Sequence, residues 1–356
     1  MTEPLHLAVA LDGAGWHPAA WRQPGARPGE LFSAGYWADL VRLAERGKLD
    51  FVTIEDRSAP APDAAPDDDR TDLVRGRLDA LLIAARVAPL TSRIGLVPTV
   101  VATHTEPFHV STQLATLDYL SHGRAGWRVQ AAPEVDRTIP DLFQEAADHV
   151  EVVRRLWDSW ADDAEIRDVA TGRFIDRDRL HYIDFAGRHF SVRGPSITPR
   201  PPQGQPLVAA LAHSRLPYEF AAANADVVFV TPADAESARA IAAEVRGLTD
   251  RPLKIFADLV VYLGVRPEGE LPASDAHVFE GAPGDLADLL QSWQAAGLDG
   301  FRLRPGVLPA DLESIVDGLV PALRERGLFR TEYTADTLRG HLGLSRPANR
   351  YAAVGA

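Results

Sequence analysis

Short apolar runs alternate with amphipathic stretches along almost the whole chain. The apolar runs are rich in β-branched residues and do not alternate between apolar and polar positions, which is typical of strands covered on both faces. The pattern predicts eight strands, at residues 5–11, 50–56, 93–100, 124–130, 206–212, 226–231, 253–264 and 300–305.

The stretches between and after these runs carry apolar residues at spacings of three and four. Val150, Val153, Leu156 and Trp157, for example, fall on one face of a helix. The pattern predicts eight helices, at residues 34–47, 77–89, 107–121, 141–160, 214–224, 233–246, 284–297 and 309–327.

Eight alternating strand–helix units favour a closed parallel (β/α)8 barrel of the TIM type, formed by residues 1–356 as a single domain. Parallel neighbours need helical crossovers, and eight strands close on themselves. The competing architecture is an open doubly wound sheet, which carries a glycine fingerprint after its first strand. Here the segment that follows Leu11 lacks that fingerprint and continues into His17 and Pro18, which disfavours a helix start at this point.

Three segments fall outside the repeat. Residues 59–72 are rich in Pro and Asp, so we expect a solvated loop after the second strand. Residues 161–205 are too long for a simple link and form an insertion before strand five, in which residues 179–192 predict a hairpin. Residues 328–356 predict a C-terminal tail that packs on the barrel or on a partner subunit.

Composition narrows the range of partners. Acidic residues outnumber basic ones by 50 to 37, and the formal charge of −13 repels phosphate backbones and anionic lipids, so we expect neither nucleic acid nor a membrane as a partner. The chain has no cysteine and no apolar run of the ~20 residues that would span a bilayer. Because its start also lacks the features of a secretory signal, we expect a cytoplasmic protein. The abundance of Ala, Arg, Asp and Pro is typical of bacterial genomes of high GC content.

In a barrel of this type the ligand site lies at the carboxyl ends of the strands. This rule selects residues 12–17, Glu55, Asp56, 99–104, 128–132, 211–215, Thr231 and Arg304. The spacing of His104 and His109 does not suit a metal, and no H-x-H or H-E-x-x-H motif occurs, so we expect no metal site. Glu55 and Asp56 are adjacent in a strand and point to opposite faces, which excludes a glycosidase-type carboxylate pair.

Several motifs follow one another in order along the chain. They are W-H-P-A-A-W-R at 16–22, L-D-x-L-S-x-G-R-x-G-W at 117–127, V-V-R-R-L-W-D-S-W at 152–160, G-x-H-F-x-V-R-G-P at 187–195, P-P-Q-G-x-P at 201–206 and R-G-L-F-R-x-E-Y at 326–333. With these motifs the chain resembles the bacterial-luciferase-like flavin monooxygenases, in particular the branch that oxidises nitrilotriacetate and dibenzothiophene sulfone. The resemblance implies a (β/α)8 barrel, usually dimeric or tetrameric. It also implies that reduced FMN, supplied by a separate flavin reductase, activates O2 to oxygenate a small organic substrate.

The resemblance also implies cofactor-binding residues. Asp56, Thr99, Thr103 and Ser214 stand at positions of the family's flavin site, and Ser214 begins a helix whose free N–H groups can hold a phosphate. Arg128 replaces the family's asparagine, and because a buried arginine needs an anion, we assign it to the cofactor as well. The structural alternatives are a cap of the following loop for Asp56 and a salt bridge from Arg128 to Glu55 or Asp56.

We assign His17 and Trp21, in the loop after the first strand, to the substrate, with a packing role as the alternative for His17. No residue is assigned as general acid or base.

Other positions depart from the family pattern. Ile139 and Phe143 stand where the family has His and Tyr, and the loop that ends at Pro217 lacks the family's glycines. These changes remove hydrogen bonds to a phosphate and close approach of the backbone to it. Two alternatives therefore stay open, a deazaflavin-dependent oxidoreductase of the same superfamily and a non-catalytic barrel that has lost flavin binding.

Overall fold

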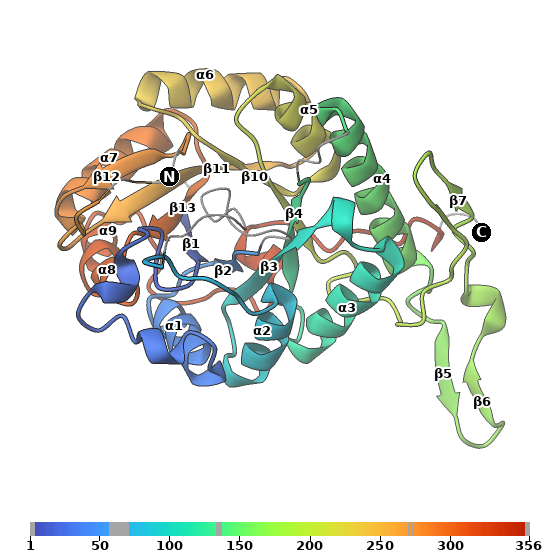
Figure 1. Cartoon of the computed structure of the whole chain (residues 1–356). Coiled ribbons are helices and arrows are strands. Elements are labelled where there is room, and N and C mark those ends of the chain that lie inside the picture. The colour runs from blue at the N-terminus through green and yellow to red at the C-terminus, as the bar shows by residue number, and fades with distance from the viewer. Residues whose placement is uncertain (1–3, 57–70, 133–136, 270, 272–273, 353–356) are drawn as a thin grey trace.

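Eight parallel strands form a closed barrel in the computed structural model, which describes residues 4–56, 71–132, 137–269, 271 and 274–352 (Figure 1). In their order around the barrel the strands are β1 (His6–Leu11), β2 (Phe51–Ile54), β3 (Gly95–Val101), β4 (Gly126–Gln130), β9 (Leu207–Leu211), β10 (Val227–Val230), β11 (Lys254–Tyr262) and β13 (Gly300–Pro305). Parallel pairing of β1 with β13 closes the ring. The predicted (β/α)8 barrel and its strand positions are confirmed.

Helices surround the strands (Figure 1). They are α1 (Ala34–Arg46), α2 (Ala80–Val87), α3 (Pro107–Leu120), α4 (Ile139–Asp158), α5 (Arg215–Asn224), α6 (Ala235–Arg246), α7 (Pro283–Ala295), α8 (Ala310–Ser314) and α9 (Val320–Glu325). A π-helical turn, Ile315–Leu319, joins α8 to α9 just before Pro321, which has no N–H to donate into a regular helix. The eight predicted helical segments are therefore confirmed, the eighth with this interruption.

The C-terminal tail closes the amino-terminal end of the barrel. Its short helix α10 (Leu338–His341) places the buried Leu338 against the first residues of β3 and β4. A Cβ added at Gly95 would lie 2.5 Å from Leu338, so only glycine leaves room for this contact. Leu338 and Leu342 share one apolar cluster with Phe51 and Phe256, which confirms that the tail packs on the barrel.

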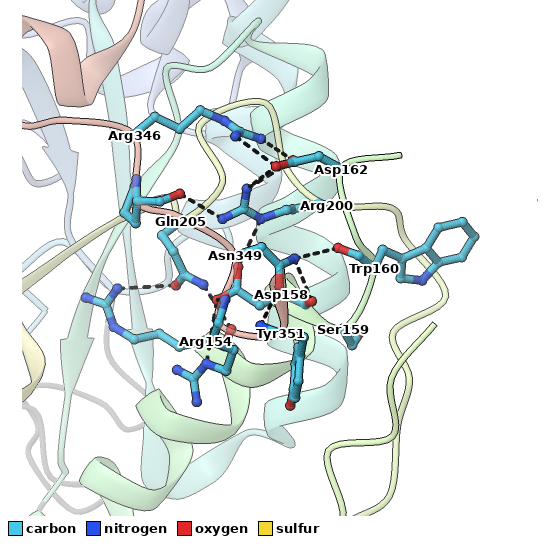
Figure 2. A network of polar contacts seen from close by, with 12 residues as sticks. Arg154, Asp158, Ser159, Trp160, Asp162, Arg200, Gln205, Arg346, Asn349 and Tyr351 are labelled. Atoms are coloured by element: carbon cyan, nitrogen blue, oxygen red, sulfur yellow. Dashed lines mark hydrogen bonds and ion pairs between the residues drawn. The ribbon is translucent and has the colours of Figure 1, made fainter. Parts of the chain in front are cut away.

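Beyond α10 the tail is fixed to the end of α4 by a partly buried polar network (Figure 2). Arg200 donates to Asp158 at 3.0 Å and to Asp162 at 3.0 Å. The side-chain amide of Asn349 donates to the backbone carbonyls of Asp158 and Trp160, at 2.9 and 2.8 Å. The insertion, the helix and the tail therefore form one connected unit.

The insertion differs from the prediction. The expected hairpin exists, but its strands β7 (Phe185–Ala186) and β8 (Ser191–Val192) have two residues each, and residues 180–184 form no strand. A second hairpin, β5 (Glu165–Asp168) with β6 (Arg173–Ile175), was missed and extends away from the barrel (Figure 1). Its side chains are mostly polar, so no apolar run marks it. The predicted loop at 59–72 lies largely outside the described residues.

The arginine of the G-R-x-G-W motif has a structural role. Arg124 is 2% exposed and donates to the carbonyl groups of Ser121, Ile94, Ala88 and Thr91, at distances from 2.7 to 3.1 Å. It thereby ties the turn before β4 to the loop before β3, at the end of the barrel that is remote from the ligand site.

Candidate active site at the barrel mouth

Five buried ionisable side chains meet inside the carboxyl end of the barrel. Asp258 on β11 and Arg302 on β13 are register partners, so both point inward, and Arg302 donates to both carboxylate oxygens of Asp258 at 2.8 Å. Arg302 also contacts Glu55 at 3.1 Å, and Glu55 accepts from Arg128 of β4 at 2.6 Å. Arg304 forms a second ion pair with Asp258. We call these five residues the mouth cluster.

Mutual attraction keeps the mouth cluster ionised. Burial alone would raise the pKa of Glu55, but Arg128 and Arg302 outweigh it and hold this pKa at about 2. Burial opposes ionisation of Asp258 in the same way, and Arg302 and Arg304 hold its pKa at about 2. Burial lowers the pKa of Arg128 to about 10, against the attraction of Glu55. At neutral pH the cluster therefore holds three cations and two anions.

Two cavities open on either side of the mouth cluster. The first has a volume of about 430 Å³ and lies between β4, β9, α4 and α5, and we name it the flavin-side cavity because the sequence predicts cofactor contacts of Arg128 and Ser214, which line it. It is lined by Arg128, Val129, Gln130, Ala131, Ile139, Phe143, Ala146, Ala210, Leu211, His213, Ser214, Leu216, Pro217 and Phe220. The second cavity, of about 160 Å³, lies under the loops that follow β1 and β2, and its lining includes Asp12, Trp16, His17, Trp21 and Glu55. Arg128 faces the first cavity and Glu55 the second.

The structure brings Thr99 and Arg128 together. The Thr99 hydroxyl accepts from Nε of Arg128 at 3.1 Å, and the ion pair of Arg128 with Glu55 matches one structural alternative raised from the sequence. The Thr103 hydroxyl accepts from the backbone N–H of Ala132 at 3.3 Å, which fixes the loop after β4. All of these residues lie at the carboxyl end of the barrel, and their part in cofactor binding stays a prediction.

Asp56 and Ser214 lie at the starts of two helices. The Asp56 carboxylate accepts from the N–H of Ala80, the first residue of α2, at 3.0 Å, so it makes a capping contact at a helix start. The alternative raised from the sequence, a cap of the loop that follows Asp56, falls on residues 57–70 outside the described part of the chain. Ser214 is the exposed N-cap residue of α5, and its hydroxyl makes no capping hydrogen bond within the described part of the chain. Ser214 is therefore placed to bind an anion in the flavin-side cavity, whereas Asp56 does not line that cavity.

His17 and Trp21 both line the second cavity. His17 is 2% exposed, its Nδ1 accepts from the N–H of Ala19 at 3.0 Å, and its ring meets that of Tyr262 edge-on at 6.1 Å. Trp21 donates from Nε1 to the carbonyl of Asp72 at 3.0 Å. Their positions suit the predicted contact with a substrate.

Sequence reasoning missed two of the five residues of the mouth cluster, Asp258 and Arg302. Each interrupts an otherwise apolar strand, and this interruption is the signal that could have found them. Glu55 and Arg304 were selected as strand-end residues, without a role of their own in the site. Among the described residues, no group of three His, Cys, Asp or Glu side chains could hold a metal ion, and no helix is long and apolar enough to cross a bilayer.

The residues of the flavin-side cavity fit a flavin. Ile139, Phe143 and Leu216 line this cavity without filling it, and its volume lies in the range of small-molecule sites. The Ser214 hydroxyl, which makes no capping hydrogen bond within the described residues, and the N-terminus of α5 suit a phosphate, and Arg128 lines the same cavity.

The family described as luciferase-like monooxygenase matches residues 14–270. The chain belongs to this family. It is 32% identical over 440 residues to N-acetyl-S-(2-succino)cysteine monooxygenase of Bacillus subtilis (strain 168), with 98% of each chain covered. It is 30% identical to nitrilotriacetate monooxygenase component A of Aminobacter aminovorans, with the same coverage. A riboflavin lyase solved with modified FMN and riboflavin superposes with a TM-score of 0.85, at 25% identity and 98% coverage of both chains.

These findings confirm the resemblance stated from the sequence motifs. The chain is an oxidoreductase of the flavin-dependent monooxygenase class, and the comparisons favour neither the deazaflavin alternative nor the non-catalytic barrel.

Proposed function

We propose that this chain, folded as a single domain, takes reduced FMN from a separate flavin reductase and uses O2 to oxygenate a small organic substrate. The observation that carries the proposal is the pair of cavities that share one barrel mouth, because an oxygenase must hold a flavin and a substrate side by side. A separate reductase is supported by the name of the nitrilotriacetate relative, which is one component of a larger system.

We further propose a cytoplasmic bacterial protein that forms a homodimer or homotetramer. The bacterial origin of the relatives supports the source. An apolar groove between α1 and α2, with Phe32 56% and Leu82 66% exposed, supports contact between subunits.

When bound, the flavin would supply the activation of O2, and the chain would bind, orient and exclude water. Ser214 and the first N–H groups of α5 would hold the phosphate, with Arg128 as a nearby cation. Phe143 and Leu216 would keep water away from the ring. Burial lowers the pKa of His17, and Arg266 lowers it further, so its ring is neutral. Because Nδ1 accepts from Ala19, Nε2 carries the proton and would donate one hydrogen bond to a substrate.

A titration under nitrogen tests the proposal. The purified chain is titrated with reduced FMN, reduced riboflavin and a reduced deazaflavin while binding is followed by calorimetry. We expect micromolar or better affinity for reduced FMN. A preference for the deazaflavin would favour hydride transfer instead, and binding of neither cofactor would contradict the proposal.

The Ser214→Ala variant locates the phosphate. Loss of one hydrogen bond to a charged acceptor should weaken FMN binding about tenfold and leave riboflavin binding unchanged. Ser237→Ala is the matched control, because Ser237 lies in the first turn of the next helix and is bonded to Asp234, outside both cavities. Equal losses in the two variants would contradict a phosphate site at Ser214.

A further inference from the structure

The mouth cluster carries one more positive charge than its own acids neutralise. Arg128, Arg302 and Arg304 face only Glu55 and Asp258 within the cluster, and all five side chains are at most 10% exposed. Asp311, another buried acid near this end, is bonded to the backbone N–H groups of Leu263 and Val307. Because an uncompensated buried charge is costly, a surplus cation here indicates an anion supplied by a ligand.

Arg304 shares Asp258 with Arg302 and has no other acid of the cluster as a partner, so we assign the surplus charge to it. Asp258 already accepts two hydrogen bonds from Arg302, and Arg128 has Glu55, Thr99 and Gln130 as partners. Arg304 is 7% exposed, and within the described residues its Nε donates to no acceptor. Its guanidinium lies 4.4 Å from the ring centroid of Trp16, which lines the second cavity.

Two further unpartnered polar atoms lie beside the end of β13. The backbone N–H groups of Trp16 and His17 donate to the carbonyls of Pro305 and Gly306, at 2.9 and 3.0 Å. Tyr262 packs so closely on Gly306 that a Cβ there would lie 2.1 Å from its ring. His17 Nε2 and the Tyr262 hydroxyl are buried and, like Arg304 Nε, have no partner among the described residues.

We propose that Arg304, with His17 and Tyr262 beside it, forms a subsite for a carboxylate group of the substrate. This inference deepens the proposed function, because it rests on the second cavity being the substrate cavity. A carboxylate would neutralise the surplus charge and accept from the three unpartnered groups, which a neutral amide of the same shape cannot do equally well.

The position of Arg304 favours the substrate over the flavin as the source of the anion. Arg304 stacks on Trp16 at the β1 and β13 side of the barrel, whereas Ser214 and the flavin-side cavity lie against β4 and β9. Two of the relatives are named after carboxylic acids, N-acetyl-S-(2-succino)cysteine and nitrilotriacetate, which agrees with this assignment, whereas others are named after dibenzothiophene sulfone, a long-chain alkane and dimethyl sulfide.

The test compares succinate with succinamide as probes of the full-length chain. Calorimetry and thermal shift should show that succinate binds the native chain at least tenfold more tightly than succinamide. Arg304→Gln should abolish that preference, and Arg304→Lys should restore part of it because it restores the charge. Asp258 keeps both hydrogen bonds from Arg302 in these variants, so we expect them to fold.

Two further variants keep the test decisive. Arg46→Gln removes the same charge from a side chain that is 56% exposed and paired with Asp317, and it should leave succinate affinity within about twofold. Tyr262→Phe deletes only an unpartnered hydroxyl, so it should weaken succinate binding several-fold without loss of stability, even if Arg304→Gln fails to fold.

Four results would overturn the subsite. They are equal binding of both probes by the native chain, retention of the succinate preference in Arg304→Gln, an equal loss in Arg46→Gln, and a loss of reduced-FMN affinity in Arg304→Gln with succinate unaffected. The last result would assign the anion to the flavin. Failure of the proposed function is seen separately, as absence of reduced-FMN binding to the native chain.

Discussion

Replacing Glu55 by glutamine should lower the free energy of unfolding by about 3 kcal/mol at neutral pH. Glutamine has the shape of the protonated acid, so the displaced pKa measures what the charge of Glu55 contributes in the folded state. That pKa falls from its ordinary value of 4.5 to about 2, and each unit corresponds to about 1.4 kcal/mol. The loss agrees with the roughly 3–5 kcal/mol typical of breaking a buried ion pair.

The pH dependence gives this prediction a second readout. Because the folded pKa is depressed, the contribution of Glu55 is fully present above pH 4.5 and is lost as the pH falls towards 2. In urea unfolding, the free energy of unfolding of the native chain should therefore exceed that of Glu55→Gln by a large difference at about pH 7, of which less than half remains near pH 3.

An exposed ion pair serves as the control for Glu55→Gln. Asp317 pairs with Arg46 at 2.6 Å, but both side chains are 56% exposed, so Asp317→Asn should cost less than about 1 kcal/mol. The reasoning is refuted if Glu55→Gln unfolds at the same urea concentration as the native chain, or if the difference between their free energies of unfolding does not depend on pH.

Three further substitutions test other parts of the structure. Arg124→Lys should lower the free energy of unfolding in urea by about 3 kcal/mol or more, because one ammonium group cannot reach the several carbonyls to which the guanidinium donates. A loss below about 1 kcal/mol would contradict the structural role of Arg124. Asn349→Ala removes three hydrogen bonds, so it should cost about 3 kcal/mol and speed proteolysis of the tail. An unchanged cleavage rate would show that the network does not hold the tail. Burial lowers the pKa of His149 to about 4, whereas the unfolded chain takes up this proton near pH 6.5, so the free energy of unfolding decreases as the pH falls from 6.5 to 4. In urea unfolding of His149→Leu, this decrease should be smaller than in the native chain by up to about 3 kcal/mol. An equal decrease in both chains would contradict the prediction.

The barrel could be predicted from the sequence because its parallel strands are covered on both faces. Burial on both sides selects continuous apolar runs, such as the β10 sequence VVFV. The helices between the strands are equally recognisable, because their apolar residues recur at spacings of three and four. The elements that were missed lack this signal. β12 (His277–Glu280) and the β5–β6 hairpin are partly exposed, and pairing with a neighbouring strand, which composition does not reveal, holds them in place.

The candidate site was predictable in position but not in partners. The rule that ligands bind at the carboxyl ends of barrel strands was sufficient to select Glu55, Arg128 and Arg304. It could not show that Glu55 meets Arg302, which is 247 residues away in the sequence, because this contact depends on barrel closure and strand register. The sequence therefore left the partner of Arg128 open between two acids.

The mouth cluster itself argues that this end of the barrel binds a ligand. A buried group of charges seldom adds stability, and well-packed apolar side chains would often serve the fold as well or better. The opposite end of the same barrel has that solution, because Phe51, Phe229 and Phe256 pack there with Leu338. The amino-terminal end of the barrel is thus filled by packed apolar side chains. The carboxyl end, where two cavities open, holds a charged layer that is not fully neutralised. Selection for stability alone would favour the first arrangement at both ends, so the second indicates binding.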